Sequence, residues 1–182
     1  KPLEVTHKKP LSIPMDFPSF SLNKWSISIF NFLYYHKQFA SKKSAVIPLK
    51  PFFYPLDSLL NWNRIYGKKG FIQYQLVLPK EAGKEGISRI LTFLHQKNLR
   101  SFLSVLKLFG EGEGMMSFPM KGYTLTLDIP MRARILPLLD DLDRIVIDHG
   151  GRVYLTKDAR LSSEAFREMY PKWRTFQEIL NR

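Results

Sequence analysis

Gln73 and Gln75 are the first residues of this chain whose type and spacing could do chemistry. They lie two positions apart in an apolar run that is typical of a β-strand. Side chains at such spacing point to one face of a sheet, which places Tyr74 on the opposite face. Amide groups are costly to bury in an apolar strand without partners. Two interpretations follow: an edge strand with this face in water, or a polar floor for a ligand.

Two lysines lie in comparable places. Lys107 interrupts the apolar run 103–109, and Lys157 comes directly after the run 153–155, with Asp158 next to it. Taken alone, Lys157 and Asp158 could form a surface ion pair worth less than about 1 kcal/mol. Together, several polar groups on sheet strands favour a binding face more strongly than any one of them does alone.

Other kinds of site have little support in the sequence. The chain has no cysteine, which excludes disulfides, zinc–thiolate sites, iron–sulfur clusters and a cysteine nucleophile. Its four histidines show no metal-ligand spacing, so we predict no metal site. The run Gly110–Gly114 contains two glutamates, which would repel phosphate, and it lacks the spacing of a nucleotide-binding loop. We interpret it as a mobile loop and expect 110–116 to be the least ordered internal segment.

Charge and composition suggest a globular chain with an anionic partner. The 28 Lys and Arg residues outnumber the 16 acids, giving a formal net charge of +12, and the excess lies in the first 110 residues. This bias favours nucleic acid, a phosphorylated ligand or an anionic membrane surface, with a merely soluble basic face as the alternative. At 182 residues the chain can bury a core. Its first residue is not Met, and we expect it to be a fragment of a longer protein.

The apolar pattern from residue 70 onward predicts the order β-α-β-β-α-β. This is the split βαβ arrangement of ferredoxin-like folds, an α+β class with an antiparallel sheet backed by two helices. Two further helices are expected near the carboxyl end. The strands are predicted at 71–78, 102–109, 122–129 and 152–156, and the helices at 84–97, 135–149, 162–170 and 172–180.

The amino-terminal part is predicted to be a helical extension of that fold. Residues 1–21 are rich in proline and irregular, and 22–36 form a helix dense in aromatic residues. Such a helix could lie buried against the rest of a larger protein, which we favour, or rest on a membrane interface. We also predict a strand at 45–53 and a short helix that Asp57 caps, that includes Leu59 and Leu60, and that ends at Gly67. The domain ranges predicted are 1–49 and 50–182.

Seven short motifs occur in one order along residues 50–175. They are Phe53-Tyr-Pro-Leu-Asp57, Trp62-Asn-Arg-x-Tyr-Gly67, Gly70-Phe-x-Gln-Tyr-Gln75, Leu106-Lys-Leu-Phe-Gly110, Ser117-Phe-Pro119, Gly150-Gly-Arg-x-Tyr-x-x-Lys-Asp158 and Met169-Tyr-Pro171. As an ordered set they resemble the carboxy-terminal, substrate-binding half of decaprenylphosphoryl-β-D-ribose oxidase-like FAD-linked oxidoreductases. That family is of the vanillyl-alcohol oxidase and para-cresol methylhydroxylase type.

The resemblance implies a part of a larger bacterial flavoenzyme. An upstream domain, expected before Lys1, would hold the FAD, and a tail would follow Arg182, so this segment alone is expected to be inactive. The implied reaction oxidises a hydroxyl of a sugar, or of a polyprenyl-phosphate-linked ribofuranose at its 2-hydroxyl, by hydride transfer to the flavin. A partner reductase and peripheral membrane contact are further partners that the resemblance allows. The implied location is the cytoplasm or the inner-membrane surface, with the periplasm left open.

The resemblance also carries roles onto single residues. Lys157 matches a lysine at the reactive edge of the flavin, which gives it a catalytic and cofactor-binding role, and Tyr154 lies beside it. A fixed cation there would stabilise negative charge on the reduced flavin. Residues implied to bind substrate are Arg64, Gln73, Gln75, Lys107, Thr124 and Thr126. Mycobacterial members carry Asn and Cys at the last two positions, so the substrate can differ from theirs.

A second hypothesis is a free-standing basic ferredoxin-like module that binds RNA or another anionic partner. The run Lys69-Gly70-Phe71 is similar to part of an RNA-recognition motif, but Ile72 and Gln73 depart from it. The sequence upstream of Lys1 separates the two hypotheses, because only the flavoenzyme requires an FAD-binding region there. Nucleic acid is therefore not a partner in the leading hypothesis.

Overall fold

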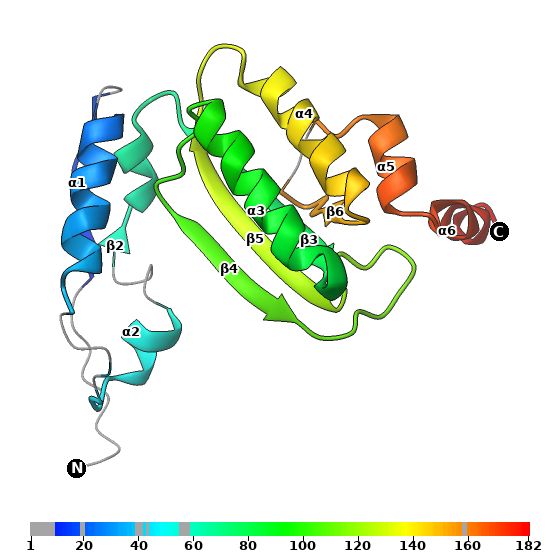
Figure 1. Ribbon diagram of the computed structural model, residues 1–182, viewed down its shortest axis with the longest axis horizontal. Coiled ribbons are helices and arrows are strands. Elements are labelled where there is room, and N and C mark those ends of the chain that lie inside the picture. The colour runs from blue at the N-terminus through cyan, green and yellow to red at the C-terminus, as the bar shows by residue number, and fades with distance from the viewer. Residues whose placement is uncertain (1–9, 19–20, 39–41, 43, 55–58, 158–159) are drawn as a thin grey trace. The chain divides into compact units, whose positions relative to one another are not determined.

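The computed structural model describes residues 10–18, 21–38, 42, 44–54, 59–157 and 160–182. It divides into two compact units, residues 1–70 and 71–182, which are described separately (Figure 1). The domain ranges predicted from sequence, 1–49 and 50–182, stay a prediction.

The second unit has the predicted α+β fold with a four-stranded antiparallel sheet. Its elements are β3 (Phe71–Pro79), α3 (Lys80–Gln96), β4 (Ser104–Phe109), β5 (Gly122–Pro130), α4 (Ile135–Asp148) and β6 (Arg152–Val153). The strand order is β4-β5-β3-β6, and each neighbouring pair is antiparallel. Because β3 and β4 are both antiparallel to β5, they run parallel to each other with β5 between them. This split arrangement is the ferredoxin-like topology.

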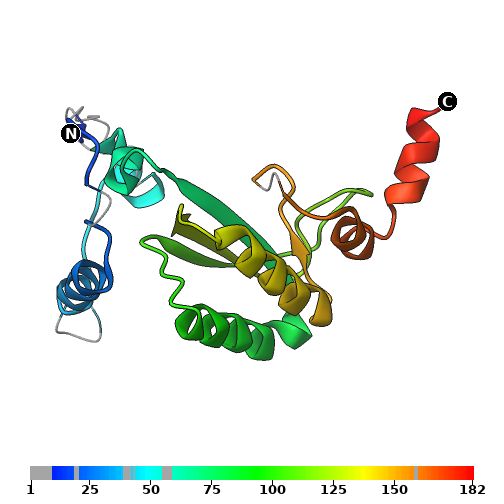
Figure 2. The same cartoon turned by 90° about the horizontal axis from the view of Figure 1, so that it is seen from above.

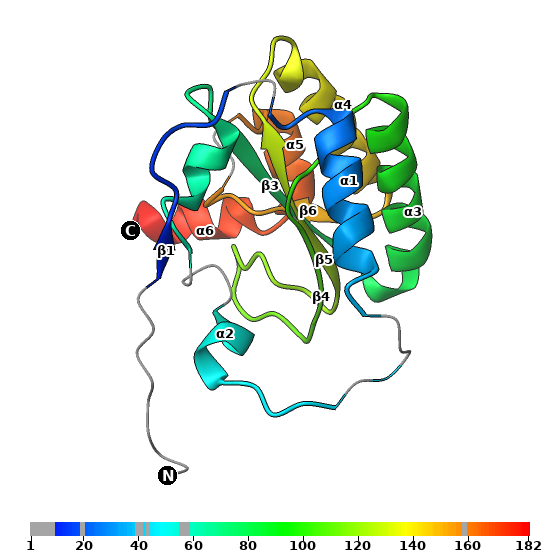
Figure 3. The ribbon, with the colours of Figure 1, turned by 90° about the vertical axis from the view of Figure 1, so that its left-hand side faces the viewer.

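The core lies between one face of the sheet and two helices. Figures 2 and 3 show α3 and α4 together on one side of the strands. Alternate residues of β3, among them Leu76 and Leu78, face these helices and are fully buried against Ile90 of α3 and Leu139 of α4. Gly86 permits this close packing, because a Cβ at that position would lie 2.4 Å from Cδ1 of Leu78 and would force the leucine side chain to shift. The alternation that predicted the strands therefore also fixes which face is buried.

The last strand is shorter than predicted. Only Arg152–Val153 pair with β3, and residues 155–157 form a turn instead of continuing the predicted strand to 156. The turn is closed by the N–H of Lys157, which donates to the carbonyl of Tyr154 at 3.1 Å. Tyr154 keeps one sheet-like contact, since its N–H donates to the carbonyl of Gln75 at 2.9 Å.

Two helices follow the sheet, as predicted. They are α5 (Ser163–Met169), which Ser162 caps by accepting from the N–H of Ala165, and α6 (Trp173–Leu180). Tyr170, at the end of α5, is buried and donates its hydroxyl to the carbonyl of Val153 at 2.6 Å. Burial raises the pKa of Tyr170 to about 12. This hydrogen bond connects the end of α5 to the short edge strand β6.

In the first unit the predicted aromatic helix is confirmed. This is α1 (Lys24–Tyr35), and Asn23 caps it by accepting from the N–H groups of Trp25 and Ser26. Large apolar side chains remain exposed around the helix, including Trp25 at 69% and Tyr35 at 80%. No helix among the described residues is both long enough and apolar enough to cross a membrane.

The strand predicted at 45–53 is wrong. Residues 44–48 are irregular, and Leu49–Phe53 form a five-residue helix, α2. Pro51 falls in the first turn of this helix, where a backbone N–H has no intrahelical acceptor, so the proline costs nothing there. In a strand the same proline would remove a ladder donor.

The helix predicted to include Leu59 and Leu60 is also partly wrong. These two residues form β2 (Leu59–Leu60), which pairs in parallel with β1 (Leu11–Ser12). The helical segment is the short 3-10 helix η2 (Trp62–Tyr66). It ends as predicted at Gly67, whose φ of 69° suits glycine. The predicted cap Asp57 lies outside the described residues.

Candidate active-site face of the sheet

The face of the sheet that α3 and α4 do not cover brings most of the predicted site residues together. The register pairs Gln73 with Asp128, Gln75 with Thr126, and Lys107 with Thr124. Paired residues share a face, so these side chains form one polar surface, which we call the open face. Tyr74 lies on the other face and is 1% exposed, as the strand pattern predicted.

Gln73 is held by a carboxylate that lies directly across the ladder. Its Nε2 donates to Oδ1 of Asp128 at 2.8 Å. Asp128 is fully buried, at 0% exposure, while Gln73 is half-buried. The carboxylate therefore sits beneath the surface and the amide lies above it.

Gln75 is held by a hydroxyl on a diagonal position of β5. Its Nε2 donates to Oγ1 of Thr124 at 3.2 Å. The Thr124 hydroxyl in turn donates to the carbonyl of Leu76 at 2.8 Å. Thr124 is 1% exposed. Both glutamines are thus tied to the sheet by buried partners.

The remaining open-face residues are more accessible. Lys107 is exposed on the edge strand β4, and Thr126 is half-buried beside Gln75. Tyr154 stacks on Phe118 with ring centroids 4.6 Å apart, and Phe109 meets Phe118 edge-on at 6.1 Å. The open face therefore combines amide and hydroxyl groups, an ammonium group, and the three rings of Phe109, Phe118 and Tyr154, which we call the aromatic wall.

Two predicted site residues lie elsewhere. Lys157 is exposed in the turn after β6, and its neighbour Asp158 lies outside the described residues, so the predicted catalytic role stays a prediction. Arg64 belongs to the first unit, where its Nη1 donates to the carbonyls of Ile13 and Pro14 at 3.2 and 2.8 Å. These bonds hold the amino-terminal segment against η2.

The covered side of the sheet carries a separate polar network. Asp143 of α4 is 4% exposed and accepts from the hydroxyl of Tyr74 at 2.6 Å. Arg160 forms a two-pronged ion pair with the same carboxylate, at 2.7 and 2.9 Å. Paired geometry of this kind is the strong form of a buried ion pair. The network ties β3, α4 and the segment before α5 together, and it faces away from the open face.

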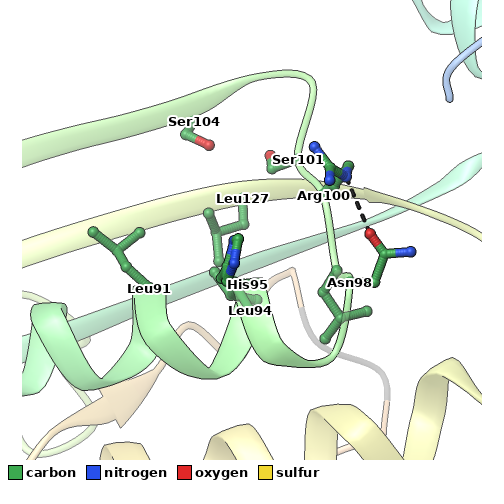
Figure 4. A pocket seen from close by; sticks show the side chains of 9 residues that line it. Leu91, Leu94, His95, Asn98, Arg100, Ser101, Ser104 and Leu127 are labelled. Carbon is green, nitrogen blue, oxygen red and sulfur yellow. Dashed lines mark hydrogen bonds between the residues drawn. The ribbon is translucent and has the colours of Figure 1, made fainter. Parts of the chain in front are cut away.

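A half-open cleft of about 220 Å³ lies on the covered side as well, at the carboxyl end of α3 (Figure 4). Leu91, Leu94 and His95 of α3 and Leu127 of β5 line it, and Arg100 there donates to the side chain of Asn98 at 3.1 Å. None of the predicted site residues lines this cleft. Among the described residues no group of three or more His, Asp or Glu could hold a metal ion.

Comparison with known proteins gives this surface a context. Over 172 residues the chain is 38% identical to decaprenylphosphoryl-beta-D-ribose oxidase from Mycolicibacterium smegmatis. The chain resembles one part of that oxidase. The match covers 94% of this chain and 37% of the oxidase, so the resemblance drawn from the ordered motifs is confirmed.

A second relative is an uncharacterized protein in the mprA 5' region of Streptomyces coelicolor, 44% identical over 77 residues. That match covers 41% of this chain and 21% of the relative, so the chain spans well under half of either protein. No family model matches the chain.

Sequence reasoning missed several residues of the open face. Asp128 continues the alternation of Thr124 and Thr126, so its face could have been predicted, but its pairing with Gln73 depends on a register that the pattern does not give. The motif Ser117-Phe-Pro119 marked Phe118 without revealing its stacking on Tyr154. Spacing along a strand identifies a face, whereas a contact from a loop needs the three-dimensional fold.

Proposed function

We propose that this chain is the substrate-binding part of an FAD-dependent oxidoreductase that oxidises a hydroxyl of a sugar, or of a polyprenyl-phosphate-linked sugar, by hydride transfer to the flavin. The likeness to the oxidase along 94% of the chain supports this assignment. The observation that carries it is the open face, where Gln73, Gln75 and Lys107 gather on the sheet surface that α3 and α4 do not cover. Amides and an ammonium are the groups that bind sugar hydroxyls and phosphate oxygens.

The charge of the open face fits an anionic partner. Its one carboxylate among the paired residues, Asp128, is fully buried and bonded to Gln73, whereas Lys107 is exposed. The surface therefore presents neutral and cationic groups, which suits a flavin that gains negative charge or a substrate that carries phosphate.

The chain's own residues fit a role beside FAD. Tyr154, with its ring on Phe118, and Lys157, three residues later in an exposed turn, would be the groups to contact it. FAD bound by the rest of the protein would supply the hydride acceptor. Lys157 would then hold a positive charge near the flavin, while Gln73, Gln75 and Lys107 would bind and orient the sugar. Packing of the aromatic wall would keep water from that surface.

The helix α1 suggests a further contact of the intact protein. Its exposed aromatic residues are followed by Lys37 and Lys42, and residues 17–56 contain no Asp or Glu. Either a protein surface or a membrane interface could cover such a segment; anionic lipid complements its charge. If lipid covers it, the double variant Trp25→Ser, Phe32→Ser should weaken binding of the intact protein to anionic vesicles. Unchanged vesicle binding would leave a protein surface, such as a partner reductase or the upstream domain.

The RNA-binding alternative gains less from the structure. Modules of this topology that bind RNA stack bases on aromatic side chains of the central strands. Here the central positions of the open face carry Gln73 and Gln75 on β3 and Thr124 and Thr126 on β5. These four central positions supply hydrogen bonds but no aromatic ring on which a base could stack.

Reduction of the bound flavin tests the proposed function. The intact protein, mixed without oxygen with decaprenylphosphoryl-β-D-ribose, should lose its oxidised flavin absorbance in a stopped-flow experiment. Lys157→Ala should slow this step by about 10²-fold, the scale for losing one preorganised electrostatic contact. Arg89→Ala, on the exposed surface of α3, is the control and should reduce its flavin at the normal rate. A Lys157→Ala enzyme as fast as the control would remove Lys157 from the mechanism.

A further inference from the structure

The orientation of the Gln73 amide is fixed by the chemistry of its partner. An ionised carboxylate has only acceptor groups, so it can bond the NH2 end of an amide but not the carbonyl end. Asp128 is fully buried and lies 2.8 Å from Nε2 of Gln73. The structure thus turns the NH2 end of Gln73 toward Asp128, and with Asp128 ionised the opposite orientation would place the amide oxygen against a carboxylate. Its carbonyl oxygen is left on the side away from Asp128.

The orientation of the Gln75 amide is fixed by a relay of two bonds. The carbonyl of Leu76 can only accept, so it takes the hydroxyl proton of Thr124 at 2.8 Å. With that proton engaged, Thr124 Oγ1 can only accept from Gln75, at 3.2 Å. The NH2 end of Gln75 must therefore face Thr124, which again leaves the carbonyl oxygen as the outward end.

The two free amide oxygens lie side by side on the open face. Gln73 and Gln75 are two residues apart on β3, a rise of about 6.6 Å along the strand. Within the described part of the chain neither Oε1 receives a hydrogen bond. Lys107, on the same face across β5, is the nearby cationic donor by register. The surface thus offers two acceptors that need donors, beside one ammonium.

We infer that Gln73 and Gln75 form an acceptor pair that selects ligands by their free hydroxyl groups, and that Asp128 and Thr124 are positioning residues that lock this polarity. The inference rests on the proposed function and names the feature of the sugar that the site recognises. Two hydroxyls of one ring can donate to two carbonyl oxygens, whereas an ether or a phosphate oxygen has no proton to donate. The phosphate of a lipid-linked sugar would be directed toward Lys107 instead.

Equilibrium binding to the intact protein, with its flavin reduced beforehand under anaerobic conditions so that the sugar is not oxidised, tests the acceptor pair. The two probes are decaprenylphosphoryl-β-D-ribose and its 3-O-methyl ether, which lacks one hydroxyl donor. The wild-type protein should bind the hydroxyl form about tenfold or more tightly, the scale for one hydrogen bond left unmade in a shielded site. Thr124→Val, which keeps the side-chain shape without the relay, should reduce this ratio to near one. Thr124→Ser keeps the hydroxyl and should retain the ratio.

Two further variants distinguish a loss of selectivity from misfolding. Gln75→Leu removes the acceptor itself from a half-buried position, so the ratio of the two affinities should fall to near one, as in Thr124→Val. Asp141→Asn, exposed on α4, should bind both probes as the wild type does. If Thr124→Val and Gln75→Leu discriminate as well as the wild type, or if Thr124→Ser loses as much as Thr124→Val, the inference is overturned. If the wild-type protein binds neither probe, the proposed function fails and the inference falls with it.

Discussion

The two faces of the same sheet each hold a buried carboxylate, and the two are satisfied in different ways. On the covered side, Asp143 meets a two-pronged guanidinium from Arg160 and the hydroxyl of Tyr74. On the open side, Asp128 meets the neutral amide of Gln73. Asp143, bonded to Arg160 and Tyr74, connects the helix α4 to the strand β3 and to the segment before α5. Asp128, bonded to the NH2 group of Gln73, determines that the Gln73 amide turns its carbonyl oxygen away from that carboxylate.

The two sides of the sheet should therefore differ in what their residues contribute: fold stability on the covered side and ligand binding on the open face. Residues on the covered side pack against α3 and α4, so changing them should mainly alter the free energy of unfolding. Residues on the open face do not pack against α3 or α4, so changing them should mainly alter ligand binding. The two sides therefore predict two distinct sets of mutant behaviour.

The largest effect is expected at Asp143. Asp143→Ala would remove the carboxylate that binds Arg160 at two points and accepts from the Tyr74 hydroxyl, at a cost of about 3 kcal/mol in the free energy of unfolding. This is the low end for breaking a buried ion pair, because Arg160 still binds Asp140 at 2.8 Å. Asp141 lies two residues earlier on α4 and is exposed, so Asp141→Ala should change that free energy by less than about 0.5 kcal/mol. Chemical denaturation measures both. Equal losses in the two variants would contradict a structural role for the network.

A smaller effect, on binding rather than stability, is expected at Lys107. Lys107→Ala should weaken binding of decaprenylphosphoryl-β-D-ribose by about tenfold, because an ammonium bound to an anionic oxygen contributes roughly 1.5–3 kcal/mol. Its side chain is exposed, so the free energy of unfolding should hardly change. Titration calorimetry on the intact protein checks the first statement and denaturation the second. A lower free energy of unfolding with unchanged affinity would indicate that Lys107 stabilises the fold and does not bind substrate.

A third effect, which appears only at high pH, concerns Tyr170. An unfolded chain loses the tyrosine proton near pH 10, whereas in the fold burial raises the pKa of Tyr170 to about 12. The folded state then holds more protons between these values, so the free energy of unfolding should fall as the pH rises from about 10 to about 12. Tyr170→Phe should remove this part of the fall. Denaturation curves at pH 9 and pH 11.5 for both proteins would show it, and an identical pH slope would speak against the shifted pKa.

The sequence predicted the parts of this picture that depend on alternation. The strands of the sheet, the two covering helices and the placement of Gln73 and Gln75 opposite Tyr74 all follow from period-two and helical patterns. The strand predicted at 45–53 failed because a short apolar run by itself fits a strand or a helix, and Pro51 fits the first turn of a helix better than a strand.

Contacts between residues that are far apart in the sequence could not be predicted from the sequence pattern. Asp128 beneath Gln73 depends on the register of β3 against β5, and the stacking of Phe118 on Tyr154 depends on the path of a loop. The roles of Lys157 and Arg64 came from the family resemblance. Arg64 makes its bonds within the first unit, and Lys157 is exposed in a turn, so a test in the intact protein decides their part in the reaction.

Photo-crosslinking from neighbouring positions of β4 tests directly whether the open face binds the substrate. Lys107 lies on the open face, while Leu108, the next residue, points to the covered side, and both are exposed. A photoreactive phenylalanine is placed at one position or the other in the intact protein, which is then irradiated with saturating radiolabelled decaprenylphosphoryl-β-D-ribose. The open-face account predicts label on the protein with the probe at 107 and little with the probe at 108. Label at 108 and none at 107 would contradict it.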